Sequence, residues 1–293
     1  MQIALALGVT VVSACCLNLG YLLQHRVASQ LPALSFRRPI VSLRSLVGNH
    51  RWLAGLGLEG VGWLFYIGAL ALAPLSLVQA TAAGGIGILA IMVSRFTRVP
   101  LTGRERIGVA VSVVGLALLG VSLLGDHGEG SVAGYLWVGV WLVASATAAL
   151  VCVGLLAGAI GGGPAWGIAA GILFAAGDVS TKMAVAGGPQ NIPFFACLIV
   201  FYGVGTAVLQ AGFQRGSALT TAGLATLMTN ALPIAAGMTV FGEPLPAGPV
   251  GAIRIIAFAA VVAGAVFLAS PAKAAEPPPM ALEARGLRSE TPG

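Results

Sequence analysis

The sequence predicts an all-α membrane protein with about nine transmembrane helices, arranged as two inverted four-helix repeats and a linking helix. Composition gives the class: of 293 residues, 58% are hydrophobic and only 8% are charged. The mean hydropathy is +0.97. Most of such a chain cannot form a solvated surface. Two similar stretches, described below, predict the repeat.

The individual spans follow from apolar runs of about 20 residues, the length that crosses a hydrocarbon core of about 30 Å. A transmembrane barrel would instead show alternating segments of about 10 residues, which the sequence does not contain. The expected spans are 2–23, 52–73, 75–94, 107–124, 133–159, 164–186, 192–212, 217–241 and 250–270.

Two stretches resemble each other, Pro74–Pro100 and Gln214–Pro246. In each, a Ser-containing turn enters a small-residue helix, and a Pro-Leu step leads into another apolar helix. One membrane unit used twice is the pattern of secondary transporters, although similar composition alone is the alternative explanation. The expected organisation is a first repeat over 1–124, a linking loop and helix over 125–163, a second repeat over 164–270 and a disordered tail over 271–293.

Arginines are concentrated in the connection 24–51 and after the third span, so both regions are expected to be cytoplasmic. The expected location is the cell (inner) membrane. With an odd number of helices, the N-terminus is expected outside and the C-terminus in the cytoplasm. The net charge of +6 belongs mostly to these loops, so no nucleic-acid partner is expected. The connection 24–51 is either a helix on the inner leaflet or a solvated loop.

Glu59 is the first candidate site residue, because an ionisable group inside a span is costly. It shares a helix face with Gly55, Gly62 and Tyr66, where small neighbours let a second helix or a cavity approach. The carboxylate could bind a cation or exchange a proton. The alternative is an interfacial carboxylate that reaches an arginine of the basic loop.

Asp178 and Lys182 are the second candidate, spaced i and i+4 on the sixth span. A structural ion pair would neutralise both groups, and a pair that breaks and re-forms during transport is the other interpretation.

Asn230 is the third candidate, because Pro233 removes a helical hydrogen bond nearby and frees carbonyl groups that could contact a ligand. A kink satisfied by a neighbouring helix is the alternative. Gln79 precedes a Gly-rich stretch where substrate or another backbone could approach. Arg254 is expected to anchor at the outer interface.

The chain shows little sign of enzyme chemistry. No His, Asp and Glu cluster occurs, the three histidines (His25, His50 and His127) fall in expected loops, and no nucleophile and base are suitably spaced. We therefore expect no catalytic residue and no cofactor, and leave a metal-ligand set unassigned.

The runs YIGALALAPLSLVQATAAGGIGILAIMVSRFTRVPLTGRE and FQRGSALTTAGLATLMTNALPIAAGMTVFGEPLP resemble the drug/metabolite transporter superfamily, EamA-like. The GEPL step at 242–245 and the segment GILFAAGDVSTKMAV carry the same resemblance. The early LLQHR and the APLSLV turn are most similar to the NIPA-type magnesium transporter branch. Alignment on Ala73 and Pro74 places Trp63 where that branch usually has an acidic residue, with Glu59 one turn earlier.

The resemblance implies a secondary transporter of a small solute, either a metabolite or a divalent cation such as magnesium, that works by alternating access. Its expected partners are this substrate and the lipid bilayer, and the small-residue faces serve either internal packing or a homodimer. The alternative function is a non-transporting scaffold or accessory subunit of an envelope assembly. The expected substrate-binding or coupling residues are Glu59, Gln79, Asp178, Lys182 and Asn230.

Overall fold

The computed structural model describes residues 2–32, 34, 39–72, 85–98, 100–122, 134–185, 188–242 and 248–269. Helices make up the regular structure of this part of the chain. They are α1 Gln2–Ala28, α2 Pro39–Val47, α3 His50–Leu72, α5 Gly85–Thr97, α6 Gly103–Ser122, α7 Tyr135–Val151, α8 Ala157–Ile160, α9 Gly162–Val185, α10 Pro193–Phe213, α11 Ala218–Thr239 and α12 Pro249–Ala269. A π-helical turn joins α7 to α8, and a 3-10 turn precedes α10.

Seven helices in the described ranges are long and apolar enough to cross a membrane, so the chain is a multi-pass membrane protein. They are α1, α3, α6, α7 with its extension through α8, α10, α11 and α12. Each expected span overlaps one helix, or α7 and α8 together for 133–159, and outside the third span the ends differ by at most five residues. Residues 75–84 of the expected third span lie outside the described residues.

Two helices decide whether the number of spans rises from seven toward nine. Helix α5 is apolar but short over its described part. Helix α9 has 24 residues but carries Asp178 and Lys182 and is not among the seven. The count of about nine spans and the inverted repeat stay predictions.

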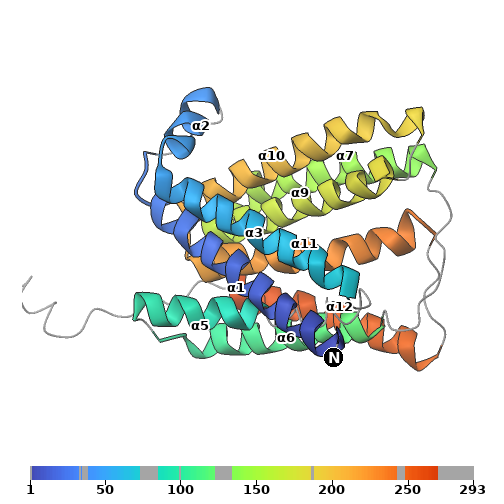
Figure 1. The fold of residues 1–293 in the computed structure, drawn as a ribbon, viewed down its shortest axis with the longest axis horizontal. Coiled ribbons are helices and arrows are strands. Elements are labelled where there is room, and N and C mark those ends of the chain that lie inside the picture. The colour runs from blue at the N-terminus through green and yellow to red at the C-terminus, as the bar shows by residue number, and fades with distance from the viewer. Residues whose placement is uncertain are drawn as a thin grey trace, which may run out of the picture.

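Three helix pairs dominate the packing: α1 with α3, α9 with α10, and α6 with α12. Figure 1 shows α1 and α3 side by side in blue, and α7, α9 and α10 grouped in green and yellow. In the α6–α12 pair, Gly108 lies beside Leu268 and Gly115 beside Val261, so the two helices are antiparallel.

Helices α9 and α11 approach each other at glycines. A Cβ atom added to Gly167 would lie 2.4 Å from the carbonyl oxygen of Thr221, and one added to Gly171 would lie 2.5 Å from that of Ala225. Because both contacts advance by four residues, α9 and α11 are parallel. Only glycine permits this backbone contact, which is the usual means of close helix packing in membranes.

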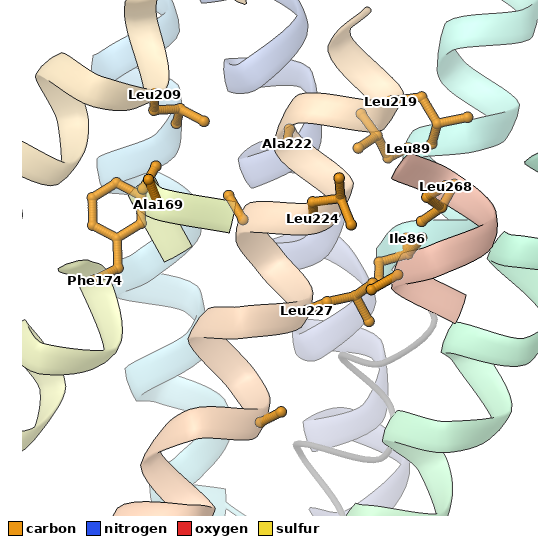
Figure 2. Close-up of a cluster of buried hydrophobic side chains, with 14 of the residues drawn as sticks. Ile86, Leu89, Ala169, Phe174, Leu209, Leu219, Ala222, Leu224, Leu227 and Leu268 are labelled. Atoms are coloured by element: carbon orange, nitrogen blue, oxygen red, sulfur yellow. The ribbon is translucent and has the colours of Figure 1, made fainter. Parts of the chain in front are cut away.

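Helix α11 lies at the centre of the hydrophobic core (Figure 2). Its Leu224 and Leu227 are fully buried. Leu209 and Phe174, from α10 and α9, lie on one side of α11 in this view, and Leu268 of α12 lies on the other. The core therefore joins the helices of the first and second halves of the chain.

The connection before α3 contains a helix, α2. Of the two interpretations of this connection, a helix on the inner leaflet requires a helix here. Leu46 of α2 packs with Val27 and Trp52 in a small apolar cluster, whereas Val41 is 64% exposed. A position of α2 on the inner leaflet remains a prediction.

Two expectations about polar residues are wrong. His25 and His50 lie within helices α1 and α3 and not in loops. Arg254 is only 1% exposed and is not an interfacial anchor. Its guanidinium donates to the carbonyl oxygen of Ser122 at 2.7 Å and to the Ser122 hydroxyl at 3.2 Å. Carbonyl groups at the end of a helix lack intrahelical partners, so this arginine satisfies the end of α6.

Candidate functional site

Glu59 lies where α1 and α3 touch through glycines. A Cβ atom added to Gly20 would lie 2.8 Å from the carbonyl oxygen of Gly55 and 3.3 Å from the Cβ atom of Glu59. One turn further, the Ser13 hydroxyl donates to the Gly62 carbonyl at 2.7 Å. The small residues beside Glu59 therefore allow a second helix, α1, to approach. This is one of the two possibilities that the small neighbours on its face of α3 left open.

The carboxylate of Glu59 ends a chain of hydrogen bonds that crosses three helices. We call Trp52, Gln210, Gln24 and Glu59 the amide chain. The Trp52 indole donates to Gln210 Oε1 at 3.0 Å, Gln210 Nε2 donates to Gln24 Oε1, and Gln24 Nε2 donates to Glu59 Oε2 at 2.7 Å. Both glutamines have no exposed surface, and Trp52 is 3% exposed.

The direction of the amide chain is fixed by its first member. An indole can only donate, so Gln210 must present its oxygen to Trp52 and its NH₂ group to Gln24. Gln24 must then accept with its oxygen and present its own NH₂ group to Glu59. The chain thus delivers a donor to the carboxylate and stabilises its ionised form. Because the donor is a neutral amide, the negative charge of Glu59 is stabilised and not cancelled.

A second polar position lies between α9 and α10. The Tyr202 hydroxyl donates to Asp178 Oδ1. The Tyr202 ring packs on Gly177, where an added Cβ atom would lie 2.9 Å from it. Lys182, one turn further along α9, is exposed, and its ammonium lies 4.0 Å from the centre of the Phe241 ring. The structure thus gives Asp178 a tyrosine partner that the i, i+4 spacing did not suggest.

The contact at Glu59 and the contact at Asp178 resemble each other, but the helices that carry the carboxyl and the phenol are exchanged. Gly20 of α1 lies against Glu59 of α3, and Gly177 of α9 lies against Tyr202 of α10. The residues that follow these glycines are Tyr21 and Asp178. Each helix pair therefore places one carboxyl and one phenol beside a glycine contact.

Asn230 bonds within its own helix. Its Nδ2 donates to the Thr226 carbonyl at 2.7 Å, and the Thr229 hydroxyl donates to the Ala225 carbonyl at 2.9 Å. Helix α11 continues through Pro233, whose ring nitrogen cannot donate to the carbonyl of Thr229. The polar side chains of this turn thus partner carbonyls about two turns before the proline.

The sequence-predicted site residues therefore occupy separate contacts. Glu59 belongs to the α1–α3 pair, Asp178 and Lys182 lie on α9, and Asn230 lies on α11. Gln79 lies outside the described residues. Asn18 reaches α5, where its Nδ2 donates to the Gly85 carbonyl at 3.1 Å.

Sequence reasoning missed Gln24, Gln210 and Tyr202. These side chains are neutral at ordinary pH, so the cost of burying a charged group does not single them out. Their signal was nevertheless present, because a polar amide inside an apolar run must find a hydrogen-bond partner. Gln210 in AVLQAGF is such a residue.

Within the described ranges, no group of three or more His, Cys, Asp and Glu side chains is placed to hold a metal ion. Such a cage suits a dehydrated transition metal. Magnesium usually keeps several waters and uses one or two carboxylates, so a single carboxylate such as Glu59 is compatible with it.

The chain is similar to a curated protein, the probable magnesium transporter NIPA9 of Arabidopsis thaliana. The two are 25% identical over 269 residues, which cover 82% of this chain and 74% of the relative. No family model matches the chain. No solved structure matches it either.

Proposed function

We propose that this protein is a secondary transporter that moves a small solute across the cell membrane by alternating access, with magnesium as the first substrate to test. The similarity to a probable magnesium transporter over most of the chain carries the proposal. The seven membrane-length helices and the carboxyl groups between helix pairs agree with it. Glu59 is the proposed binding or coupling carboxylate.

The packing supports two inverted units, α1, α3, α5 and α6 in the first and α9 to α12 in the second. Each unit opens with a glycine-mediated pair, α1–α3 and α9–α10. The last helices of the units, α6 and α12, pack against each other in opposite directions. Equivalent helices of an inverted repeat must run in opposite directions, so this pairing is the one that inversion requires.

The proposed substrate path follows from this arrangement. Glu59 and Asp178 occupy related places in the two units, and Asn230, Gln79 and Lys182 are the further proposed contacts. Glu59 is nine residues from the start of α3, or about 14 Å along the helix axis. That distance is about half of a 30 Å hydrocarbon core, the depth at which transporters of this kind bind substrate.

Flux through proteoliposomes tests the proposal. Purified protein is reconstituted, and uptake and efflux of Mg²⁺ and of a panel of amino acids and nucleosides are followed with and without a proton gradient. Protein-dependent flux of Mg²⁺ above that of empty vesicles is expected. Flux of a metabolite alone would keep the transporter and change its substrate. Absence of flux for every solute would contradict the proposal and favour a scaffold.

A further inference from the structure

The two proposed units are tied together at one end of the bundle, where α1 ends and α10 turns into α11. His25 Nε2 lies 3.0 Å from the carbonyl oxygen of Gly216. Gln214 donates to the Ala28 carbonyl at 2.9 Å and accepts from the Leu34 amide at 3.0 Å. The Gln210–Gln24 bond lies at the same end. We call these contacts the inter-unit ties.

The inter-unit ties close this end of the molecule. Ala28 has no exposed surface, and Ala218, at the start of α11, is 4% exposed. This end carries the connection to α2, which the arginine pattern predicts to be cytoplasmic. Alternating access requires each end to open in turn, so these ties must break when the substrate path opens here.

One of the ties is also part of the amide chain. The bond from Gln210 to Gln24 crosses between the units, and the bond from Gln24 to Glu59 follows it. Hydrogen bonds in a directed chain polarise one another, and a bond to an ionised acceptor is about twice as strong as a neutral one. The strength of the cross-unit bond therefore depends on the charge of the Glu59 carboxylate.

We infer that Trp52, Gln210 and Gln24 are positioning residues that couple occupancy of Glu59 to closure of the α1–α10 end. An ionised, empty Glu59 strengthens the amide chain and holds this end closed. A divalent cation bound at Glu59 neutralises the carboxylate that accepts the hydrogen bond from Gln24. The amide chain is then weaker, and opening of the α1–α10 end is favoured. The inference rests on the proposed function for the identity of the ligand.

The test measures opening by thiol modification and does not require transport. Ala28→Cys is reconstituted in the full chain and treated with a membrane-impermeant thiol reagent, and the unsubstituted chain gives the background of the four native cysteines. Ala218→Cys serves as a second probe on the opposite side of the ties. Saturating Mg²⁺ is expected to raise the modification rate about five- to tenfold.

Two substitutions separate coupling from general loosening. Trp52→Phe removes the indole donor together with part of the ring system, and it is expected to raise the rate without Mg²⁺ about fivefold and to reduce the Mg²⁺ response. Trp63→Phe makes the same change on α3 at a side chain that is 59% exposed, and it should leave both unchanged. Gln210→Met tests the same step if Trp52→Phe does not fold.

Two results would overturn the inference. In the first, the cysteine probe is modified at the same rate in Trp52→Phe and in Gln210→Met as in the protein that retains Trp52 and Gln210. The other is a Mg²⁺ response that survives Glu59→Gln. The flux assay is read separately, so a protein that transports Mg²⁺ without this response retains its function and loses only the coupling. A response without flux would retain the coupling and exclude transport.

Discussion

Buried amides are the residues on which the proposed site depends. Gln24 and Gln210 are fully buried, and each both donates and accepts in the amide chain. A carboxylate between helices requires a donor, and an amide supplies one without cancelling its charge. Glu59 could be recognised from the sequence as an ionisable group inside a span. Its partner could not, because Gln24 lies 35 residues away on another helix, and Gln210, which bonds to Gln24, lies 186 residues from it.

A buried tryptophan, Trp52, and a half-buried one, Trp141, give a prediction at this scale. The Trp52 indole is bonded to Gln210, whereas the buried Trp141 Nε1 has no partner in the described part of the chain. Trp52→Phe leaves Gln210 Oε1 unsatisfied and should lower the free energy of unfolding by about 1 to 3 kcal/mol. Trp141→Phe removes a donor that has no partner and should lower it by less than Trp52→Phe does. Reversible unfolding in mixed detergent micelles measures both, and equal losses would contradict the assigned bonds.

Glycine contacts determine how the elements pair. The apolar runs predicted the helices to within a few residues, because run length and hydropathy are local properties. They did not predict that α9 packs against α11 or that α6 packs against α12. Those pairings depend on which small residues face each other across the bundle, as Gly264 and Ser112 do. A small residue alone does not identify its partner helix.

A matched pair of glycine substitutions tests the α9–α11 contact. Gly167→Ala would place a Cβ atom 2.4 Å from the Thr221 carbonyl oxygen, which belongs to the backbone and cannot rotate away. We expect a loss of about 1 to 3 kcal/mol in the free energy of unfolding. Gly203→Ala on α10 meets nothing within 4 Å and should be neutral or slightly stabilising. The same unfolding assay applies, and tolerance of Gly167→Ala would exclude the contact.

At the scale of the whole molecule, the arrangement supports two units of opposite orientation. A repeat is predicted from two similar stretches of the sequence, but residues 74–84 and 99 of the first stretch lie outside the described residues. The antiparallel α6–α12 pair is independent support, because it involves neither stretch. The residues around Asp178 and Tyr202 relate to those around Glu59 and Tyr21 by position and not by identity, so sequence comparison alone could not pair them.

Orientation in the membrane is a prediction of the whole chain. The arginine-rich connections place α2 and the C-terminus in the cytoplasm and the N-terminus outside. A fluorescent protein fused after Gly293 should therefore fold and fluoresce, and a cysteine replacing Arg44 of α2 should react only with reagents that reach the inner side. Labelling of α2 from outside would contradict the assigned orientation and the cytoplasmic location of the inter-unit ties.

The most direct measurement is Mg²⁺ flux in proteoliposomes for the native protein, Glu59→Gln and Glu105→Gln. Glu59→Gln keeps the shape of the side chain and removes its charge, whereas Glu105 lies in the first turn of α6, where it accepts hydrogen bonds from Thr102. We predict that Glu59→Gln lowers flux about tenfold or more, because the binding or coupling charge is lost. Glu105→Gln should transport at close to the native rate. Native flux in Glu59→Gln would contradict the assignment of Glu59 as the carboxylate that binds or couples the substrate.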